Sequence, residues 1–350
     1  MKLLVITQKV NKDDGYFGFF HDWLKLFAAK CETLTVISLE TGIYDLPSNV
    51  RVLSLGKENG RSLFQYITRY YWYSWKYRSD YTHVFCHMNP PYVVLGAPLW
   101  KLLGKKIALW YIHRNVDLKL RFAEKLIDVA YTSTPESFRI ESKKRNFMGQ
   151  AVDLAKFAKP ANVKREDDTF TIVSVGRLTP IKNIDTLIRA TRILIDRGHK
   201  LNVQLIGAAV MEGDIAYEKM LHELIVELEL EDNVLFIGNV PNKEIAEYYW
   251  KSDLSLNLCP TGGMDKAILE SMAAGIPAIV SNEAFRDYFG AHANELIFQL
   301  RDPKDCANKI EGYMKRADKK ALNTFLFGQV SQRSSLERLI TNILAILEKT

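Results

Sequence analysis

The sequence has few cysteines and no apolar run long enough to cross a bilayer. The longest apolar stretch, Tyr92 to Trp100, is about half of what a crossing needs. The apolar N-terminal run turns polar at Thr7, so no signal peptide is expected. The cysteines stand far apart, without the paired spacing of a zinc site or redox couple, which favours reduced thiols in a cytoplasmic protein: Cys31, Cys86, Cys259 and Cys306.

Several motifs and repeat patterns are also absent. No Gly-x-Gly-x-x-Gly follows any expected strand, which makes an oxidoreductase less favoured than other α/β enzymes. No Asp-x-Asp occurs, which agrees with chemistry that needs no metal. The chain has no short repeat and no low-complexity tract, so a solenoid or fibrous protein is not expected.

What is present fits two globular domains. The chain has 350 residues with 47% hydrophobic side chains, enough for two buried cores. Its 47 basic and 41 acidic side chains leave a net charge of +6. This excess mildly favours anionic substrates or a negatively charged lipid surface.

The first half alternates short apolar runs with helical stretches, which is typical of a parallel-sheet Rossmann-like domain. Its first unit is a strand, a polar loop containing Gly15 and Gly18, and a helix over 21–29. Further strands are expected at 34–37, 84–86, 107–110 and 129–132. The polar stretch 159–168 is expected to be the interdomain linker, so the first domain is predicted to span 1–158.

The alternation restarts in the second half, and a second Rossmann-like domain is predicted over 159–330. Strands are expected at 170–175, 203–206, 234–237, 254–258 and 277–280, and helices at 184–195, 217–228 and up to Ala274. Residues 331–350 are expected to be a C-terminal helix that packs back on the first domain. Its apolar residues recur at helical spacing: Leu336, Leu339, Ile340, Ile343, Leu344 and Leu347.

Two cations stand between the first strand and first helix of the second domain, in Val-Gly-Arg-Leu-Thr-Pro-Ile-Lys-Asn at 175–183. Ligands of doubly wound sheets bind at the carboxyl ends of the strands. Arg177 and Lys182 could therefore hold a diphosphate through charge-assisted hydrogen bonds. The alternative is a solvated Arg and Lys on a surface turn.

The loop Thr-Gly-Gly-Met-Asp-Lys at 261–266 stands at a second strand end and opens the helix that contains Glu270. Adjacent glycines and a helix N-terminus let backbone amides approach a phosphate. The alternative is a tight turn with Asp265 as helix cap. Glu270 could accept the hydroxyls of a ribose, or be an ordinary exposed helical glutamate.

The pattern Val-Gly-Arg-Leu-x-x-x-Lys-Asn, followed by Leu-Glu-Ser-Met-Ala-Ala-Gly-Ile-Pro-Ala-Ile, resembles the retaining glycosyltransferases of the GT-B fold, in their family-four branch. The resemblance covers roughly residues 170 to 282 most strongly. It implies two Rossmann-like domains with parallel sheets facing across a cleft. The first domain is then the acceptor-binding one and the second the donor-binding one.

The resemblance also implies roles for individual residues. Arg177 and Lys182 would bind the donor diphosphate, Glu270 the donor ribose, and His113, after a strand, would face the donor sugar. Gly18 matches part of a glycine pair near the donor phosphate. The first glutamate of the family's glutamate pair falls on Gly262, which leaves the sugar specificity open and Asp265 as the nearest carboxylate. The loop amides expected at the phosphates or sugar belong to Gly263, Met264, Asp265, Lys266 and Ala267.

The stretch 61–81 is unusually rich in tyrosine and tryptophan interleaved with arginine and lysine. Such a mixture suits a membrane interface and also base stacking. The favoured interpretation is an amphipathic helix that flanks the first sheet, because aromatic residues also fill cores.

We therefore expect a metal-independent, retaining hexosyltransferase that moves a hexosyl group from a nucleoside diphosphate sugar, with UDP or GDP as the nucleotide, to a glycan or glycolipid acceptor. No cofactor and no metal site are expected. The expected setting is cell-surface glycan or glycolipid synthesis in the cytoplasm, with peripheral contact at the inner face of the membrane. The alternatives are a sugar-nucleotide epimerase or hydrolase on the same fold and, from another class, a nucleic-acid-binding protein.

Overall fold

The chain folds into two compact α/β units. The computed structural model describes residues 1–15, 17–113, 115–163, 169–241, 243–260 and 264–350. Unit 1 consists of Met1–Gly149 and Leu336–Thr350, and unit 2 of Gln150–Ser335. Within the described ranges, no helix combines the length and apolar content that a bilayer crossing needs.

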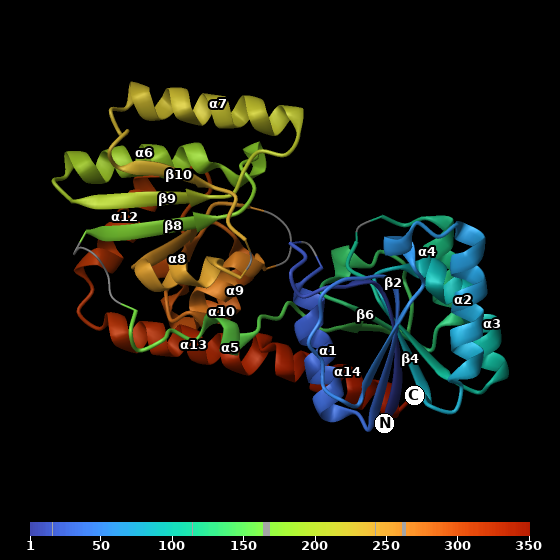
Figure 1. Ribbon diagram of the computed structural model, residues 1–350. Helices are drawn as coiled ribbons and strands as arrows, with labels where there is room; N and C mark the ends of the chain where they lie inside the picture. The colour runs from blue at the N-terminus through green and yellow to red at the C-terminus, as the bar shows by residue number, and fades with distance from the viewer. Residues whose placement is uncertain (16, 114, 164–168, 242, 261–263) are drawn as a thin grey trace. The chain divides into compact units, whose positions relative to one another are not determined.

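Unit 1 is built on a parallel seven-stranded sheet of order β3-β2-β1-β4-β5-β6-β7. The helices α2, α3 and α4 lie on one side of this sheet, and α1 and α14 on the other (Figure 1). The elements are β1 Lys2–Val10, α1 Phe19–Lys30, β2 Thr33–Thr41, β3 Val50–Ser54, η1 Lys57–Asn59, α2 Leu63–Lys76, β4 His83–His87, α3 Pro90–Leu102, β5 Lys106–Trp110, α4 Leu118–Leu126, β6 Val129–Thr132, η2 Pro135–Ser137, β7 Arg145–Phe147 and α14 Leu336–Glu348.

Unit 2 is built on a parallel five-stranded sheet of order β10-β9-β8-β11-β12. Helix α6 packs against α12, and α9 packs against α13. The elements are α5 Leu154–Phe157, β8 Phe170–Val175, η3 Pro180–Lys182, α6 Ile184–Asp196, β9 Leu201–Ile206, α7 Glu212–Glu227, β10 Val234–Gly238, α8 Ile245–Lys251, β11 Leu254–Asn257, α9 Lys266–Ala273, β12 Ala278–Val280, η4 Glu283–Phe285, α10 Arg286–Phe289, η5 Gly290–His292, α11 Ala293–Leu296, α12 Pro303–Lys315 and α13 Lys319–Ser334.

The predicted α/β fold class, with two Rossmann-like domains, is confirmed by the two parallel sheets. The switch point of each sheet, where the strand order reverses, lies between β1 and β4 in unit 1 and between β8 and β11 in unit 2. Ligands of such sheets bind outside the carboxyl ends of the strands at this point. The two switch points are therefore the places to examine for function.

The boundary between the units differs from the expected 158/159. Unit 2 begins at Gln150 because Val152 pairs with Ser335 and Phe157 is buried in the core of unit 2. Residues 331–334 end α13 in unit 2, so the C-terminal helix begins at Leu336 instead of at 331. Of the expected linker 159–168, residues 164–168 lie outside the described residues.

The C-terminal helix α14 is part of unit 1. All six of its predicted stripe residues are buried, and α14 packs against α1. The hydroxyl of Tyr131 in β6 donates a hydrogen bond to the carbonyl oxygen of Ile343 at 2.8 Å. The helix thus closes one side of the first sheet.

The apolar run at Tyr92–Trp100 belongs to helix α3, of which Trp100 is fully buried. The aromatic stretch forms helix α2, as predicted, and α2 begins with a capping box between Ser62 and Gln65. Tyr70 and Tyr73 of α2 are buried, and Tyr70 donates a hydrogen bond to the carbonyl oxygen of Tyr92 at 2.6 Å. Part of the aromatic stretch therefore fills the core, as the favoured interpretation requires.

Candidate functional site

Glycines stand at the carboxyl ends of three neighbouring strands in unit 2. Gly176 follows β8, Gly207 follows β9 and Gly238 ends β10, with φ of 152°, 133° and 79°. The amide of Gly207 donates to the carbonyl oxygen of Gly238 at 2.8 Å. A Cβ on Gly207 would lie 1.9 Å from the carbonyl oxygen of Gly176. This edge of the sheet is therefore bare backbone, which a ligand can approach closely.

Arg177 and Lys182 lie at the same edge, at the switch point between β8 and β11. A cavity there is lined by Gly176, Arg177 and Lys182 together with Asn257 and Leu258 from the end of β11. Lys182 extends across Gly176, because its Nζ would be 3.5 Å from a Cβ placed there. The structure thus brings the two predicted cations to one cavity.

Lys182 forms an ion pair with Asp265, the N-cap residue of α9. The Asp265 carboxylate also accepts hydrogen bonds from the Nδ2 of Asn257 at 2.7 Å and from the amide of Ala267 at 3.2 Å. Asp265 is therefore a helix cap, the alternative left open by the sequence, and it also holds the ammonium of Lys182 in place. The pairing joins residues 83 positions apart in the chain.

Asn183 is a site residue that sequence reasoning missed. It adopts a left-handed conformation with φ of 47° and is 4% exposed. Its Nδ2 donates to the carbonyl oxygen of Leu258 at 3.1 Å, and its Oδ1 accepts from Arg301 at 2.9 Å. Asn183 thus ties the start of α6 to the end of β11 beside the cavity. Asn is enriched in left-handed conformations, which is the only local signal it offers.

Helix α9 presents Lys266, Ala267 and Glu270 from its first turns. Glu270 is 7% exposed, which corrects the alternative of an exposed helical glutamate. Burial raises the pKa of Glu270, and the charge of Lys266, 3.8 Å away, opposes this rise. A buried carboxylate with a raised pKa gains from donors that stabilise its charge, as two ribose hydroxyls would.

Of the other residues predicted around this loop, the structure describes Met264 but not Gly263. Met264 is half-buried and packs against the core of unit 2. Gly263, like Gly262, lies outside the described residues. Its role at a phosphate stays a prediction.

Unit 1 places His113 and Gly18 at the carboxyl edge of its own sheet. His113 follows β5 and is exposed, with its ring edge-on to Tyr111 at 5.5 Å between centroids. Gly18 precedes α1, and a Cβ there would lie 2.5 Å from the carbonyl oxygen of Asp14. The loop itself therefore requires glycine at position 18, whatever it binds.

His87, at the switch point of unit 1, was not singled out from the sequence. It ends β4, is 1% exposed, and stacks on Phe20 at 3.8 Å between ring centroids. Burial lowers the pKa of His87 from 6.5 to about 3. Its neighbour Thr7 is 3.4 Å from the ring Nδ1. His87 is therefore neutral in the folded protein at physiological pH.

This shift predicts that unit 1 loses stability in mild acid. The folded chain leaves His87 neutral while the unfolded chain binds a proton below pH 6.5, so stability falls from about pH 6.5 down to about pH 3. Between pH 7 and pH 5 the loss should be about 2 kcal/mol. Denaturant unfolding at both pH values measures it. A His87→Gln variant should show a smaller difference, and an equal difference in both proteins would contradict the assignment.

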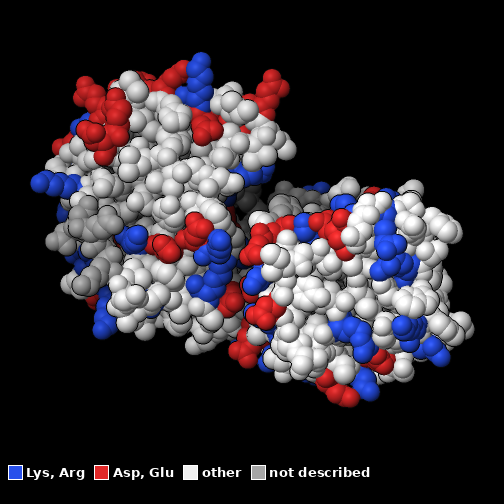
Figure 2. All heavy atoms as spheres, viewed as in Figure 1, with Lys and Arg blue, Asp and Glu red and all other residues white. Residues whose placement is uncertain are grey.

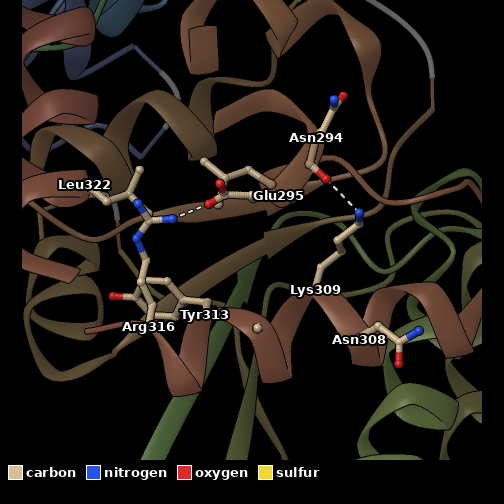
Figure 3. Close-up of a pocket in the computed structure, with 9 residues that line it drawn as sticks. Asn294, Glu295, Asn308, Lys309, Tyr313, Arg316 and Leu322 are labelled. Carbon is tan, nitrogen blue, oxygen red and sulfur yellow. Dashed lines mark hydrogen bonds and ion pairs between the residues drawn. The ribbon is translucent and has the colours of Figure 1, made fainter. Parts of the chain in front are cut away.

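A second pocket of unit 2 lies away from the glycine edge. Figure 3 shows Arg316 beside Glu295, and Lys309 donating to the carbonyl oxygen of Asn294 at 2.6 Å. Tyr313, which also lines this pocket, packs against Phe170 at the start of β8. The pocket therefore reaches the amino edge of the sheet, and its cations already have partners. It is not part of the site at Lys182.

Comparison with known proteins agrees with this geometry. Residues 156–324 match the family model described as glycosyl transferases group 1. The chain is 26% identical over 217 residues to an alpha-monoglucosyldiacylglycerol synthase of Streptococcus pneumoniae. The aligned residues cover 59% of this chain and 44% of that protein. The chain is 25% identical over 232 residues to a D-inositol 3-phosphate glycosyltransferase of Thermobispora bispora, with 64% and 53% covered. The chain thus spans about half the length of these curated relatives.

Solved structures with the same fold cover the whole chain. The structure of Anabaena Alr3699/HepE in complex with UDP aligns with a TM-score of 0.72 at 18% identity, over 100% of both chains. A glycosyltransferase from Rickettsia africae ESF-5 aligns with a TM-score of 0.72 at 14% identity, over 99% and 98% of the two chains.

Fold and site together define an α/β protein of the GT-B class with a cationic cavity at the switch point of its second sheet. Over residues 156–324 the chain is similar to the glycosyl transferases group 1. The resemblance to glycosyltransferases of the GT-B fold, predicted from the motifs around Arg177 and Glu270, is thereby confirmed, whereas the retaining mechanism and the family-four branch stay predictions.

Proposed function

We propose that this protein is a retaining glycosyltransferase, which moves a hexosyl group from a nucleoside diphosphate sugar to an acceptor hydroxyl. One observation supports this most directly: Arg177 and Lys182 meet the bare backbone of Gly176 in one cavity at the switch point. Two cations beside bare backbone at a strand end suit a diphosphate. Glu270, buried one turn inside α9, is proposed to bind the donor ribose.

In the proposed reaction, the bond between the anomeric carbon and the diphosphate oxygen breaks, and the electron pair leaves with the nucleoside diphosphate. The acceptor oxygen bonds to the anomeric carbon, and its proton is released. The negative charge that grows on the leaving diphosphate is the costly feature of this step. Arg177, Lys182 and the amides at the start of α9 would stabilise it, and His113 would face the sugar.

UDP is the proposed donor nucleotide, with GDP as the alternative. The structural neighbour Alr3699/HepE has been solved with UDP and with UDP-glucose, which supports UDP. A glycolipid acceptor is supported by the similarity to alpha-monoglucosyldiacylglycerol synthase, whose name specifies a lipid. We propose that the reaction takes place in the cytoplasm, in the synthesis of cell-surface glycans or glycolipids.

Metal independence is part of the proposal. No group of three His, Cys, Asp or Glu side chains suited to a metal occurs among the residues that the structure describes. The cations of the cavity would take over the role of a metal at the diphosphate. We expect transfer to proceed at an unchanged rate in EDTA, and a rate restored only by added Mg²⁺ or Mn²⁺ would contradict this.

The decisive experiment is calorimetry with UDP-, GDP- and ADP-sugars in the presence of EDTA, followed by product analysis with and without an acceptor. We expect sugars of one nucleotide class to bind. We also expect that sugar transfer occurs only when the acceptor is present. Lys219→Ala, on the outer surface of α7, is a matched control that should leave binding unchanged. Sugar release without an acceptor would indicate a hydrolase, an altered sugar nucleotide an epimerase, and binding of no sugar nucleotide would overturn the proposal.

A further inference from the structure

The positive charge of the chain is concentrated in one segment of unit 1. Residues 61–116 contain eight Lys or Arg residues and one acidic residue, Asp80, whereas the whole chain has a net charge of +6. This segment forms α2, β4, α3 and β5. Asp80 is paired with Arg51 at 2.5 Å, so its charge is compensated from outside the segment.

Helix α2 exposes large apolar side chains on its outer side. Phe64 is 75% exposed, Trp72 53% and Trp75 50%, although the helix buries Tyr70 and Tyr73 on its other side. The outer side of an ordinary surface helix is polar. Helix α2 contains no acidic residue at all. It therefore has apolar rings on both sides and only positive charge.

The exposed rings lie beside cations at the C-terminal end of α2. The Nζ of Lys76 lies 4.5 Å from the ring centre of Trp72, and the guanidinium carbon of Arg78 lies 4.4 Å from that of Trp75. Each pair combines an apolar ring with a hydrated ammonium or guanidinium group. This arrangement is found where proteins contact lipid head groups.

Helix α3 continues the same surface. The Nζ of Lys105 donates to the carbonyl oxygen of Arg78 at 2.8 Å, which brings the end of α3 next to the end of α2. Leu102, the last residue of α3, is 81% exposed. We call this the α2–α3 surface, formed by Trp72, Trp75, Lys76, Arg78 and Leu102. In Figure 2 the area over α2 is mostly uncharged, with Lys and Arg side chains beside it.

We propose that the α2–α3 surface binds a lipid bilayer that contains anionic phospholipids. The cations would approach the phosphate groups while Trp72, Trp75 and Leu102 enter the boundary between head groups and acyl chains. Nucleic acid is a poorer partner for the same cations. An aliphatic side chain such as Leu102 has no ring on which a base can stack, but it gains from burial in acyl chains. The proposal is independent of the transfer reaction.

The test is flotation of the full chain with phosphatidylcholine vesicles, with and without phosphatidylglycerol. We expect binding only to the vesicles with phosphatidylglycerol, and weaker binding as salt is raised. Lys76→Gln/Arg78→Gln should weaken it about thirty-fold. Trp72→Ser/Trp75→Ser should weaken it at least about ten-fold, because two interfacial rings are lost.

The matched control replaces exposed apolar residues on α7 of unit 2. Ile215 and Val226 are 60% and 61% exposed, and Ile215→Ser/Val226→Ser should leave vesicle binding unchanged. Circular dichroism verifies that each variant is folded, and quenching of tryptophan fluorescence by brominated lipid should be lost in the Trp72→Ser/Trp75→Ser variant. Three results would overturn the proposal: no flotation with either vesicle, equal effects of the control and the test variants, or binding to an RNA oligonucleotide that the same variants abolish without any vesicle binding.

Discussion

Replacing Gly207 with valine should destabilise unit 2 by about 3 kcal/mol or more and abolish binding of the sugar nucleotide. Its φ of 133° is one that side chains rarely adopt, and any Cβ there would lie 1.9 Å from the carbonyl oxygen of Gly176. To relieve this contact, the backbone of Gly176 must move, and with it the adjacent Arg177. Denaturant unfolding measures the stability, hydrogen exchange assigns the loss to unit 2, and calorimetry measures donor binding.

Gly213 offers the matched control for this variant. It lies exposed in the first turn of α7, and a Cβ there meets no atom within 4 Å. Gly213→Ala should therefore be neutral or stabilise by about 0.4 to 1 kcal/mol. A Gly207→Val protein as stable as the Gly213→Ala protein would show that the strand ends are not packed as described.

Lys182→Ala should lower kcat/KM about ten-fold or more, because a charge-assisted contact to the diphosphate contributes about 1.5 to 3 kcal/mol. The pairing with Asp265 adds to this loss. Without Lys182, the carboxylate of Asp265 faces the same cavity uncompensated and would repel the diphosphate. Arg177→Ala should lower kcat/KM by a similar factor through its own contact, without exposing a carboxylate.

A double-mutant cycle separates the two contributions of Lys182. Asp265→Asn keeps an oxygen for the amide of Ala267 but removes the negative charge. Lys182→Ala/Asp265→Asn should therefore be more active than Lys182→Ala alone. If kcat/KM of the double variant is no higher than that of Lys182→Ala, Asp265 does not act through Lys182.

A large loss of kcat/KM in Asp265→Asn alone would instead place Asp265 at the sugar, as the nearest carboxylate to the glutamate missing at Gly262. If Lys182→Ala binds the donor and its kcat/KM is unchanged, Lys182 does not contact the diphosphate.

The sequence was enough to place Arg177, Lys182 and Glu270, because strand, loop and helix follow one another within short segments there. In a parallel sheet, such segments put their loops at one edge, so local pattern translates into position. The expected strands correspond to β1, β2, β4, β5 and β6 in unit 1 and to all five strands of unit 2. The short strands β3 and β7 escaped the pattern, since β3 is half exposed and β7 has three residues.

Long-range contacts could not be predicted in the same way. The pairing of Lys182 with Asp265, and the bonds of Asn183 to Leu258 and Arg301, join segments far apart in the chain. The burial of His87 was not predicted, because it comes from Phe19, Phe20 and Trp23 on another element, α1. The exposure of Trp72 and Trp75 was equally hidden, since aromatic residues on a helix fit the core as well as a surface.

The division of the chain has a consequence for biosynthesis. Unit 2 is one continuous segment, whereas unit 1 needs α14, which follows unit 2 in the sequence. During translation, the sheet of unit 1 therefore lacks the helix that covers α1 and Tyr131 until all of unit 2 has been synthesised. A nascent chain stalled after residue 335 should expose that apolar surface to chaperones, and a fragment of residues 1–149 expressed alone should aggregate unless α14 is supplied as a peptide.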